Sequence, residues 1–169
     1  MADDDALIRH WCQSGDESAF DRFYSGQASA LWRFLVLRGV DREEAYDLVA
    51  DAFGRFIGQV CKRPDAPRAL LYRIALNLAT DWFRRRRVRP VADTEPDTLH
   101  HAQLPAELSE EARRLLTALA TDEQNLLLMR YWLGMTHREI ATVLEIPEGT
   151  VRRRAAALLE RMQDEIDDA

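Results

Sequence analysis

Residues 68–89 read R-A-L-L-Y-R-I-A-L-N-L-A-T-D-W-F-R-R-R-R-V-R, and this stretch decides how the chain folds. Its apolar side chains recur at the spacing of one helix face, at Leu71, Ile74, Ala75, Leu78 and Trp82. A second face carries Arg73, Asn77, Asp81 and Arg84, and arginines occupy positions 84–87 and 89. The pattern predicts one long amphipathic helix with a buried stripe and a polar stripe that ends in a cationic block.

The overall composition is that of a globular protein, with 47% hydrophobic and 31% charged residues in a chain of 169. No apolar run approaches the roughly 18 residues that a membrane span needs, and the first residues, M-A-D-D-D, are acidic where a secretory signal would be basic. We therefore expect a cytoplasmic protein without membrane insertion. Cys12 and Cys61 lie outside any C-x-x-C pattern and have no histidine at metal-ligand spacing. The sequence predicts two reduced thiols, no metal site and no cofactor.

The net charge of −6 conceals a strong segregation along the chain. Residues 62–89 carry nine basic and two acidic side chains, whereas residues 90–111 carry six acidic side chains and no Lys or Arg. A protein that binds DNA mainly through phosphate contacts is basic over a whole face or domain. This chain is basic in one block only, so we expect weak affinity for free DNA and a partner that brings the DNA.

Turn and cap residues divide the first half of the chain into helices. A short helix is predicted over 6–12 and a long one over 17–38, with Asp16 as the N-cap of the long helix and Gly39 as its stop. The next helix begins at Asp41, where Glu44 completes a capping-box pattern. The loop C-K-R-P-D-A-P-R, at 61–68, then forbids a continuous helix because it holds two prolines.

Cap residues divide the second half of the chain into helices in the same way. Ser109 is placed to cap a helix, and Thr121 with Gln124 and Thr136 with Glu139 form two capping-box patterns. Between the halves, residues 90–108 contain three prolines and no helical period, which predicts an extended linker of about 60 Å at full length. The sequence thus predicts an all-α protein in which two small helical domains, 1–89 and 109–169, are joined by an extended, flexible acidic linker at 90–108.

The last two helices are separated by a tight turn at Glu145 and Ile146, which is the arrangement of a helix-turn-helix. In such a unit the N-terminal residues of the second helix meet base edges in the major groove. The alternative is an αα-hairpin that only packs. The candidate DNA contacts are Glu148, Thr150, Arg152, Arg153 and Arg154, with His137 and Arg138 placed to reach phosphates.

The helix that follows Asp41 carries a stripe of charged side chains at Glu44, Asp47, Asp51 and Arg55. Solvation of a surface helix is the ordinary explanation for such a stripe. No histidine, nucleophilic lysine or glycine-rich loop joins the carboxylates, so we expect no enzymatic activity.

Three phrases of the sequence resemble segments of bacterial sigma factors, in the same order. D-R-E-E-A-Y-D-L-V-A-D-A-F-G-R-F, at 41–56, resembles their region 2.2. R-A-L-L-Y-R-I-A-L-N-L-A-T-D-W-F-R-R-R-R, at 68–87, resembles regions 2.3 to 2.4, and G-M-T-H-R-E-I-A-T-V-L-E-I-P-E-G-T-V-R-R-R, at 134–154, resembles the helix-turn-helix of region 4. Over nearly its whole length the chain resembles an extracytoplasmic-function (ECF) RNA polymerase sigma factor.

The resemblance implies sigma region 2 over 1–89 and region 4 over 109–169. It implies that region 2 clamps the β′ coiled coil of core RNA polymerase and then captures and opens the −10 element of promoter DNA. The residues that match the polymerase-binding motif are Asp47, Leu48, Asp51, Phe53 and Phe56. Those that match the −10 machinery are Lys62, Arg63 and Arg68 in or beside the loop, and Arg73, Asn77, Asp81 and Arg84 along the helix.

The resemblance further implies that the helix-turn-helix reads the −35 element, that region 4 contacts the polymerase β flap, and that the linker threads through the polymerase. Many relatives are held inactive by an anti-sigma factor, which the resemblance adds to the expected partners. On this interpretation the polymerase carries out the chemistry.

Two departures from the family pattern bear on the site. Leu70 stands where the family often has an aromatic residue, so either stacking near the melted strand is weaker or Tyr72 takes it over. Glu145 occupies a turn position where glycine is usual, which predicts a tightened or strained turn.

Two other classes of protein compete with this interpretation. An autonomous helix-turn-helix regulator would bind duplex operator DNA as a dimer, but the acidic N-terminal half and the absence of a separate dimerisation element argue against it. A purely protein-binding, anti-sigma-like helical module would leave the arginine block and Asn77 without a role.

Overall fold

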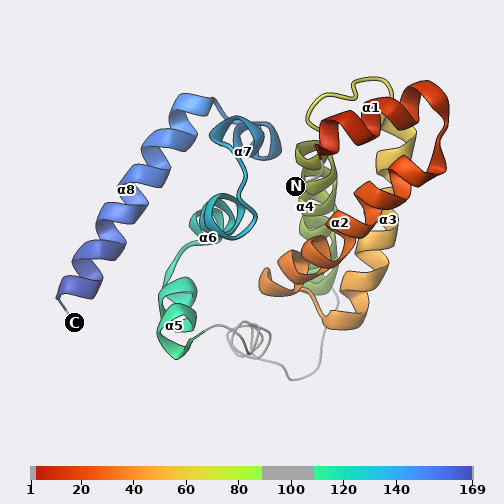
Figure 1. The fold of residues 1–169 in the computed structure, drawn as a ribbon. Coiled ribbons are helices and arrows are strands. Elements are labelled where there is room, and N and C mark those ends of the chain that lie inside the picture. Colours follow the sequence, from red (N-terminus) through yellow and green to blue (C-terminus); the bar gives the residue numbers. More distant parts are fainter. Residues whose placement is uncertain (1–2, 89–108, 169) are drawn as a thin grey trace.

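The computed structural model describes residues 3–88 and 109–168, and those residues form helices and short connections (Figure 1). The N-terminal half contains α1 (Asp4–Ser14), α2 (Glu17–Leu37), α3 (Arg42–Val60) and α4 (Pro67–Val88). The C-terminal half contains α5 (Glu110–Ala118), α6 (Thr121–Leu127), a π-helical turn (Leu128–Trp132), α7 (His137–Leu144) and α8 (Glu148–Asp167). The predicted all-α architecture of two small helical units is confirmed, while the predicted linker at 90–108 and Arg89 lie outside the described residues.

The core of the N-terminal half forms where α3 lies along α4 and where α1 crosses α2 (Figure 1). Aromatic rings fill its centre: Phe23 stacks on Phe56 with ring centroids 5.3 Å apart, and Phe34 meets the edge of Tyr72 at the same distance. The apolar stripe predicted on α4 is confirmed, because its members are buried apart from Trp82, which is partly exposed. Burial of this stripe on α2 and α3 leaves the polar stripe of α4 facing outward.

The caps and stops predicted for the helices of this half are found in the structure, with one exception. Asp16 caps α2 by accepting a hydrogen bond from the amide of Ser18 at 3.0 Å, and Gly39 ends the helix with φ 94°. The capping box expected at Asp41 and Glu44 is wrong, because the Asp41 side chain makes no cap bond. Its carboxylate lies 3.1 Å from a guanidinium nitrogen of Arg86, so an ion pair to α4 takes the place of the cap.

The capping boxes predicted in the C-terminal half divide in the same way. At α7 the prediction is confirmed: Glu139 donates its amide to the Thr136 hydroxyl at 3.1 Å, and its carboxylate accepts from the Thr136 amide at 2.8 Å. At α6 the cap residue is Ala120 and Thr121 is already helical, so that prediction is wrong. Gln124 instead turns inward and donates to the carbonyls that end α5, at 2.7 and 3.0 Å.

Glu145 ends α7 with φ 55°, which lies in the left-handed region that favours glycine. The strained turn predicted from a glutamate at this position is therefore confirmed. A non-glycine residue there costs free energy, since its Cβ crowds the backbone. The turn nevertheless completes the helix-turn-helix, and Pro147 caps α8 immediately after it. The fully buried residues Met129, Met135, Ile140 and Val151 hold α7 and α8 on the π-helical turn.

The expectation of two reduced thiols is wrong, since Cys12 and Cys61 form a disulfide. Their Cα atoms lie 5.4 Å apart although 49 positions separate them in the sequence. Packing of α1 on α2 and α4 brings them together, and sequence spacing carries no sign of that packing. The bond ties α1 to the start of the loop that leads into α4.

The two halves are in contact along α4 and α7, which lie side by side (Figure 1). The guanidinium of Arg68 donates to both carboxylate oxygens of Glu139, at 3.2 and 2.9 Å, and to the carbonyl of Leu133 at 3.2 Å. Only 14% of the Arg68 side chain and 22% of the Glu139 side chain are exposed. Burial alone would raise the pKa of Glu139, but hydrogen bonds from Arg68 and Thr136 and the charge of Arg68 outweigh it and hold that pKa below its ordinary value.

A second contact joins the end of α2 to α6. Arg38 is buried and donates to the side-chain oxygen of Gln124 at 2.5 Å. Burial lowers the pKa of the Arg38 guanidinium to about 10, with the charge of Asp122 acting in the opposite direction. The buried hydrophobic cluster is continuous across both contacts, so the halves share one core. None of the described helices is long and apolar enough to cross a membrane.

Removal of the Cys12–Cys61 disulfide should destabilise the N-terminal half. Because the bond closes a loop of 49 residues, we expect Cys12→Ser with Cys61→Ser to lower the free energy of unfolding by about 2–4 kcal/mol. Urea unfolding followed by circular dichroism measures the difference. A reductant should destabilise the wild-type protein and leave the double variant unchanged; equal stability of the two proteins under oxidising conditions would contradict the prediction.

The Arg68–Glu139 pair should contribute to stability in a pH-dependent way. Glu139→Gln keeps an acceptor for the Thr136 amide but removes the charge, so we expect it to lower the free energy of unfolding by about 1–3 kcal/mol at pH 7. A carboxyl whose folded pKa is depressed stabilises the fold above its ordinary pKa, 4.5 for Glu139, and loses that effect as the pH falls through the lower folded value. The difference between the two proteins should therefore shrink below pH 4.5. Glu160→Gln, at an exposed position on α8, is the control.

Candidate nucleic-acid interface

The polar stripe of α4 faces outward, as its spacing predicts. Asn77, Asp81 and Arg84 are exposed, and a guanidinium nitrogen of Arg84 lies 3.9 Å from the Asp81 carboxylate. Arg73 belongs to the same stripe but is partly covered. Three of the four predicted side chains therefore form one accessible row that offers amide, carboxylate and guanidinium groups.

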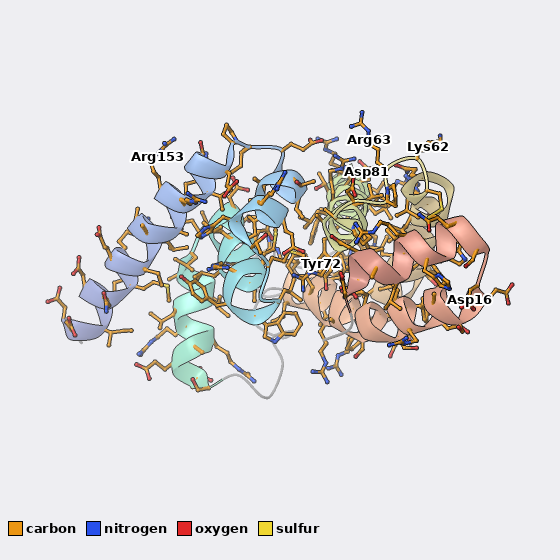
Figure 2. All side chains as sticks on the ribbon, turned by 45° about the horizontal axis from the view of Figure 1, so that its top comes forward. Asp16, Lys62, Arg63, Tyr72, Asp81 and Arg153 are labelled. Carbon is orange, nitrogen blue, oxygen red and sulfur yellow. A yellow bond between two sulfur atoms is a disulfide. The ribbon has the colours of Figure 1, made fainter. Side chains whose placement is uncertain are left out.

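The loop before α4 adds two exposed cations. Lys62 and Arg63 follow the disulfide directly and project into solvent (Figure 2). Ala66 turns the chain with φ 52°, and Pro67 then starts α4, where a proline is well accommodated because the first helical amide needs no partner. The disulfide and the Arg9–Asp65 pair, at 3.9 Å, hold the loop against α1.

Arg68 and Arg73 do not share this freedom. Arg68 is taken up by Glu139 and the Leu133 carbonyl, and a guanidinium nitrogen of Arg73 lies 3.8 Å from the Glu145 carboxylate. The sequence patterns included these two arginines among the DNA contacts and gave no sign of their carboxylate partners. Those partners lie more than 70 positions away on α7 and its turn.

Tyr72 is not available to stack on a base in this arrangement. Its ring is fully buried where α4 meets α2, and its hydroxyl has no hydrogen-bond partner among the residues that the structure describes. Burial raises the pKa of this phenol; the charge of Arg68 lowers it by less, and the charge of Asp4 adds to the rise. The expectation that Tyr72 replaces the missing aromatic at Leu70 is therefore wrong: position 72 falls on the buried side of the helix.

The helix-turn-helix presents its predicted contacts at the start of α8. Arg152 donates to the Glu148 carboxylate at 2.6 Å, and Arg153 donates to the Thr150 hydroxyl at 3.2 Å. These pairs hold two guanidinium groups in place on the exposed side of the helix, and Figure 2 shows Arg153 extending away from the protein. At the start of α7, Arg138 is exposed and His137 is partly so.

Arg154 lies apart from its two neighbours. It lines a groove of about 350 Å³ between α6, α7 and α8, together with the apolar side chains Leu126, Leu144, Ile146, Val151 and Leu158. Asp122, Glu123 and Arg161 stand at the same groove, and Arg161 pairs with Glu123 at 2.7 Å. Position 154 therefore borders an apolar groove with charged edges.

The carboxylate stripe of α3 is also exposed. Asp47 and Asp51 face solvent, Leu48 is partly buried, and Asp51 accepts two hydrogen bonds from Arg55 at 3.1 and 3.4 Å. Phe53 and Phe56, which the sequence motif placed in the same interface, lie in the core with at most 4% of each residue exposed. They support α3 from behind and, as placed here, do not reach its outer surface.

Two exposed apolar side chains on α3 were missed by the sequence patterns. Tyr46 is 64% exposed and stacks on Trp32 with centroids 5.2 Å apart, while Ile57 is 45% exposed. An aromatic residue outside the apolar period of a helix is the signal that could have identified Tyr46. Ile57 directly follows Phe56, so its spacing alone would also fit the buried face.

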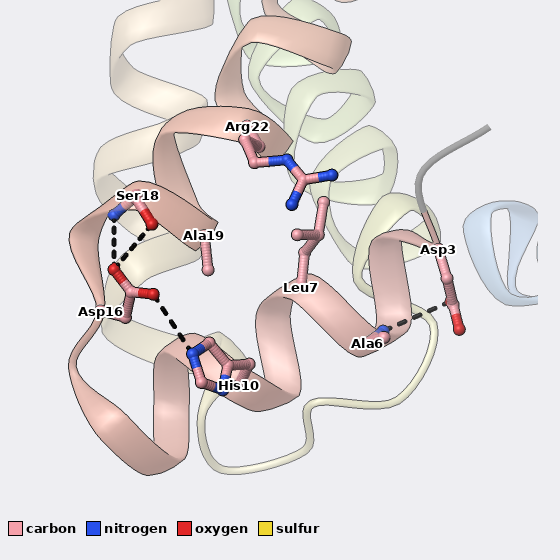
Figure 3. A pocket seen from close by; sticks show the side chains of 8 residues that line it. All are labelled: Asp3, Ala6, Leu7, His10, Asp16, Ser18, Ala19 and Arg22. Carbon is pink, nitrogen blue, oxygen red and sulfur yellow. Dashed lines mark hydrogen bonds and ion pairs between the residues drawn. The ribbon is translucent and has the colours of Figure 1, made fainter.

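A hollow of about 410 Å³ lies between α1 and α2, away from these surfaces (Figure 3). His10 and Asp16 are joined at one side of it, 3.2 Å apart, and Arg22 extends toward Leu7 across it. The hollow is open, and its lining contains none of the predicted contacts. Within 3–88 and 109–168 no three His, Cys, Asp or Glu side chains converge to hold a metal ion.

Comparison with known proteins places the chain in a family. A family model described as sigma-70, region 4 matches residues 109–162. The ECF RNA polymerase sigma factor SigL of Mycobacterium tuberculosis is 31% identical over 143 residues, which cover 78% of this chain and 79% of that protein. The RNA polymerase sigma-E factor of Streptomyces avermitilis is 26% identical over 164 residues, 90% of this chain and 88% of that protein.

A solved structure shares the fold over the whole chain. CnrH, determined in complex with the cytosolic domain of CnrY, is 23% identical, with a TM-score of 0.65 over 98% of this chain and 97% of that one. The relatives span both halves of the sequence, including the α4 stripe and the helix-turn-helix. The chain belongs to the ECF family of RNA polymerase sigma factors.

Proposed function

We propose that this sigma factor binds core RNA polymerase and directs it to promoters, with the 61–66 loop and α4 opening the −10 element and α7 and α8 reading the −35 element. The observation that carries the proposal is the pairing of two separate, small DNA-facing elements in an otherwise acidic chain. Neither element is basic over a whole domain, so neither is suited to hold duplex DNA alone. A polymerase that already holds the DNA supplies the missing affinity.

At the −10 element the exposed row of α4 suits an unpaired strand better than a duplex. Asn77 and Asp81 offer an amide and a carboxylate to the Watson–Crick edges of extruded bases, while Arg84 offers a guanidinium to phosphate or to a base face. Lys62 and Arg63 lie on the adjoining loop, where they neutralise phosphates around a captured base. Binding of the open strand then favours melting without an input of chemical energy.

At the −35 element the start of α8 enters the major groove, as the second helix of this motif does. Arg152 and Arg153, held by Glu148 and Thr150, are suited to bidentate bonds with guanine or with phosphate. Arg138 and His137 at the start of α7 are placed for phosphates. Arg154, which borders the apolar groove, is proposed to add a further contact with the −35 element.

Two surfaces are proposed for the polymerase itself. Asp47, Leu48 and Asp51 of α3 form an acidic face for the β′ coiled coil, with Tyr46 beside it as an exposed aromatic anchor. The groove between α6, α7 and α8 is suited to an apolar segment of the β flap, because its apolar floor is open and its edges are charged. The polymerase performs the chemistry in this scheme, and the protein acts where the polymerase is, in the cytoplasm.

Regulation by a protein partner is part of the proposal. CnrH was solved in complex with the cytosolic domain of a second protein, CnrY. By analogy, an anti-sigma protein that covers α4 and α7–α8 would prevent both DNA contacts at once.

Transcription from a randomised promoter library with core polymerase tests the function directly. We expect discrete start sites that depend on adding this protein, because α4 and α8 select the two promoter elements. Equal initiation by core polymerase alone would contradict the proposal. A shift of duplex DNA by the protein alone at physiological salt would instead favour an autonomous helix-turn-helix regulator.

The acidic face should be needed for binding to the polymerase. Asp47→Lys with Asp51→Lys reverses two exposed charges one helical turn apart, so we expect co-purification with core polymerase to fall about tenfold or more. Loss of the exposed Asp51–Arg55 pair has little effect on stability, so helicity should be unchanged. Glu160→Lys with Asp164→Lys, an exposed pair at the same spacing on α8, is the control; if both variants bind core polymerase equally well, the assignment of the α3 face is wrong.

A further inference from the structure

We propose that the contact between α4 and α7 is an autoinhibitory latch, in which carboxylates of the −35 reader occupy Arg68 and Arg73, two arginines that match the −10 machinery of the family and that the open state would release to the strand. The inference rests on the proposed function, and it adds a closed state that must open before a promoter can be bound.

The Arg68–Glu139 pair is the centre of the latch. All three nitrogens of the guanidinium are used: two donate to the carboxylate and the third to the Leu133 carbonyl. With 14% of its side chain exposed, Arg68 is largely closed to a phosphate while this contact persists. Glu139 thus stands where a phosphate of the −10 strand would bind, with the same charge and a similar pair of oxygens.

Arg73 extends the latch toward the far end of α7. It faces Glu145, which lies 3.8 Å away in the strained turn that ends the helix, with 70% of the carboxylate side chain exposed. This pair is long and hydrated, so it is the weaker of the two. Glu139 and Glu145 therefore bracket α7, and each meets one arginine of α4.

The latch also has a cost, which makes opening possible. Arg38 is buried at the contact between α2 and α6, and the hydrogen bond from its guanidinium to another side chain goes to a neutral amide, that of Gln124. The charge of Asp122 offsets only part of the effect of burial, and a cation removed from water with incomplete compensation opposes the closed state. Separation of the halves would rehydrate Arg38. The free-energy difference between the closed and open arrangements is therefore the sum of opposing contributions, and a partner that binds one arrangement can change which of them is favoured.

Geometry makes the closed state incompatible with a promoter. The centres of −10 and −35 elements lie about 25 base pairs apart, or roughly 85 Å at 3.4 Å per base pair. Yet Glu139, which bonds Arg68, is the immediate helical neighbour of His137 and Arg138, which are assigned to the −35 element. A residue pair in contact cannot serve two sites that far apart, so α7 must leave α4 before both elements are engaged.

Glu139→Gln tests the latch, because glutamine can keep the capping box of α7 while losing the charge that holds Arg68. We expect small-angle X-ray scattering to show a larger radius of gyration for the variant than for wild type. We also expect half-maximal promoter-specific transcription at about tenfold lower concentration of the variant, since a larger fraction of it is open. Glu160→Gln on α8 matches the charge change and should behave as wild type in both measurements.

Several results would overturn the inference. An unchanged radius of gyration would show that Glu139 does not hold the halves together, and an expanded variant without a transcriptional gain would show that the contact is not inhibitory. Should Glu139→Gln fail to fold, Glu145→Gln is expected to give a smaller change in the same direction, and no change there would also count against the latch. If neither wild type nor variant supports promoter-specific transcription, the proposed function itself fails, whatever the scattering shows.

Discussion

The bidentate ion pair between Arg68 and Glu139 joins the two halves of the chain, and it sets how the two elements proposed to bind DNA lie relative to each other. Each partner is placed by a local rule. Arg68 falls in the first turn of α4 because Pro67 starts that helix, and Glu139 is held at the start of α7 by its capping box with Thr136. The same carboxylate therefore shapes the helix-turn-helix and attaches it to α4. Mutual burial strengthens the pair, since water competes less for either charge.

The Arg68–Glu139 pair is one of several contacts in which an acidic group meets a basic residue near α4. The basic residues of the N-terminal half are concentrated around α4, and in this structure acidic groups meet several of them: Glu139 at Arg68, Glu145 at Arg73, Asp81 at Arg84 and Asp41 at Arg86. Such contacts lower the affinity of the free protein for nucleic acid. A protein that must act only together with a polymerase is well served by cations that become available after the polymerase has brought the DNA. The Cys12–Cys61 bond acts on the same region, because it holds α1 beside the loop that carries Lys62 and Arg63.

Much of the fold could be predicted from the residues in order. The stripe on α4, the stop at Gly39, the capping box of α7 and the left-handed turn at Glu145 were all visible as local patterns, because helix propensity, capping and turn chemistry act over a few neighbouring residues. The errors were local patterns overridden by distant partners. Asp41 pairs with Arg86 instead of capping α3, Gln124 turns inward toward the end of α5, and Tyr72 is drawn into the core against Phe34.

By itself, then, the sequence determined the helices, their caps, the helix-turn-helix and the outward row of Asn77, Asp81 and Arg84, since each follows from the period of the α-helix. Only the tertiary structure decided which of those side chains are free. The disulfide, the burial of Phe53 and Phe56 behind the acidic face, and the capture of Arg68 by Glu139 all join residues whose separation along the chain carries no periodic signal. Such contacts follow from how whole helices pack, and they set the charge and accessibility on which recognition of a promoter depends.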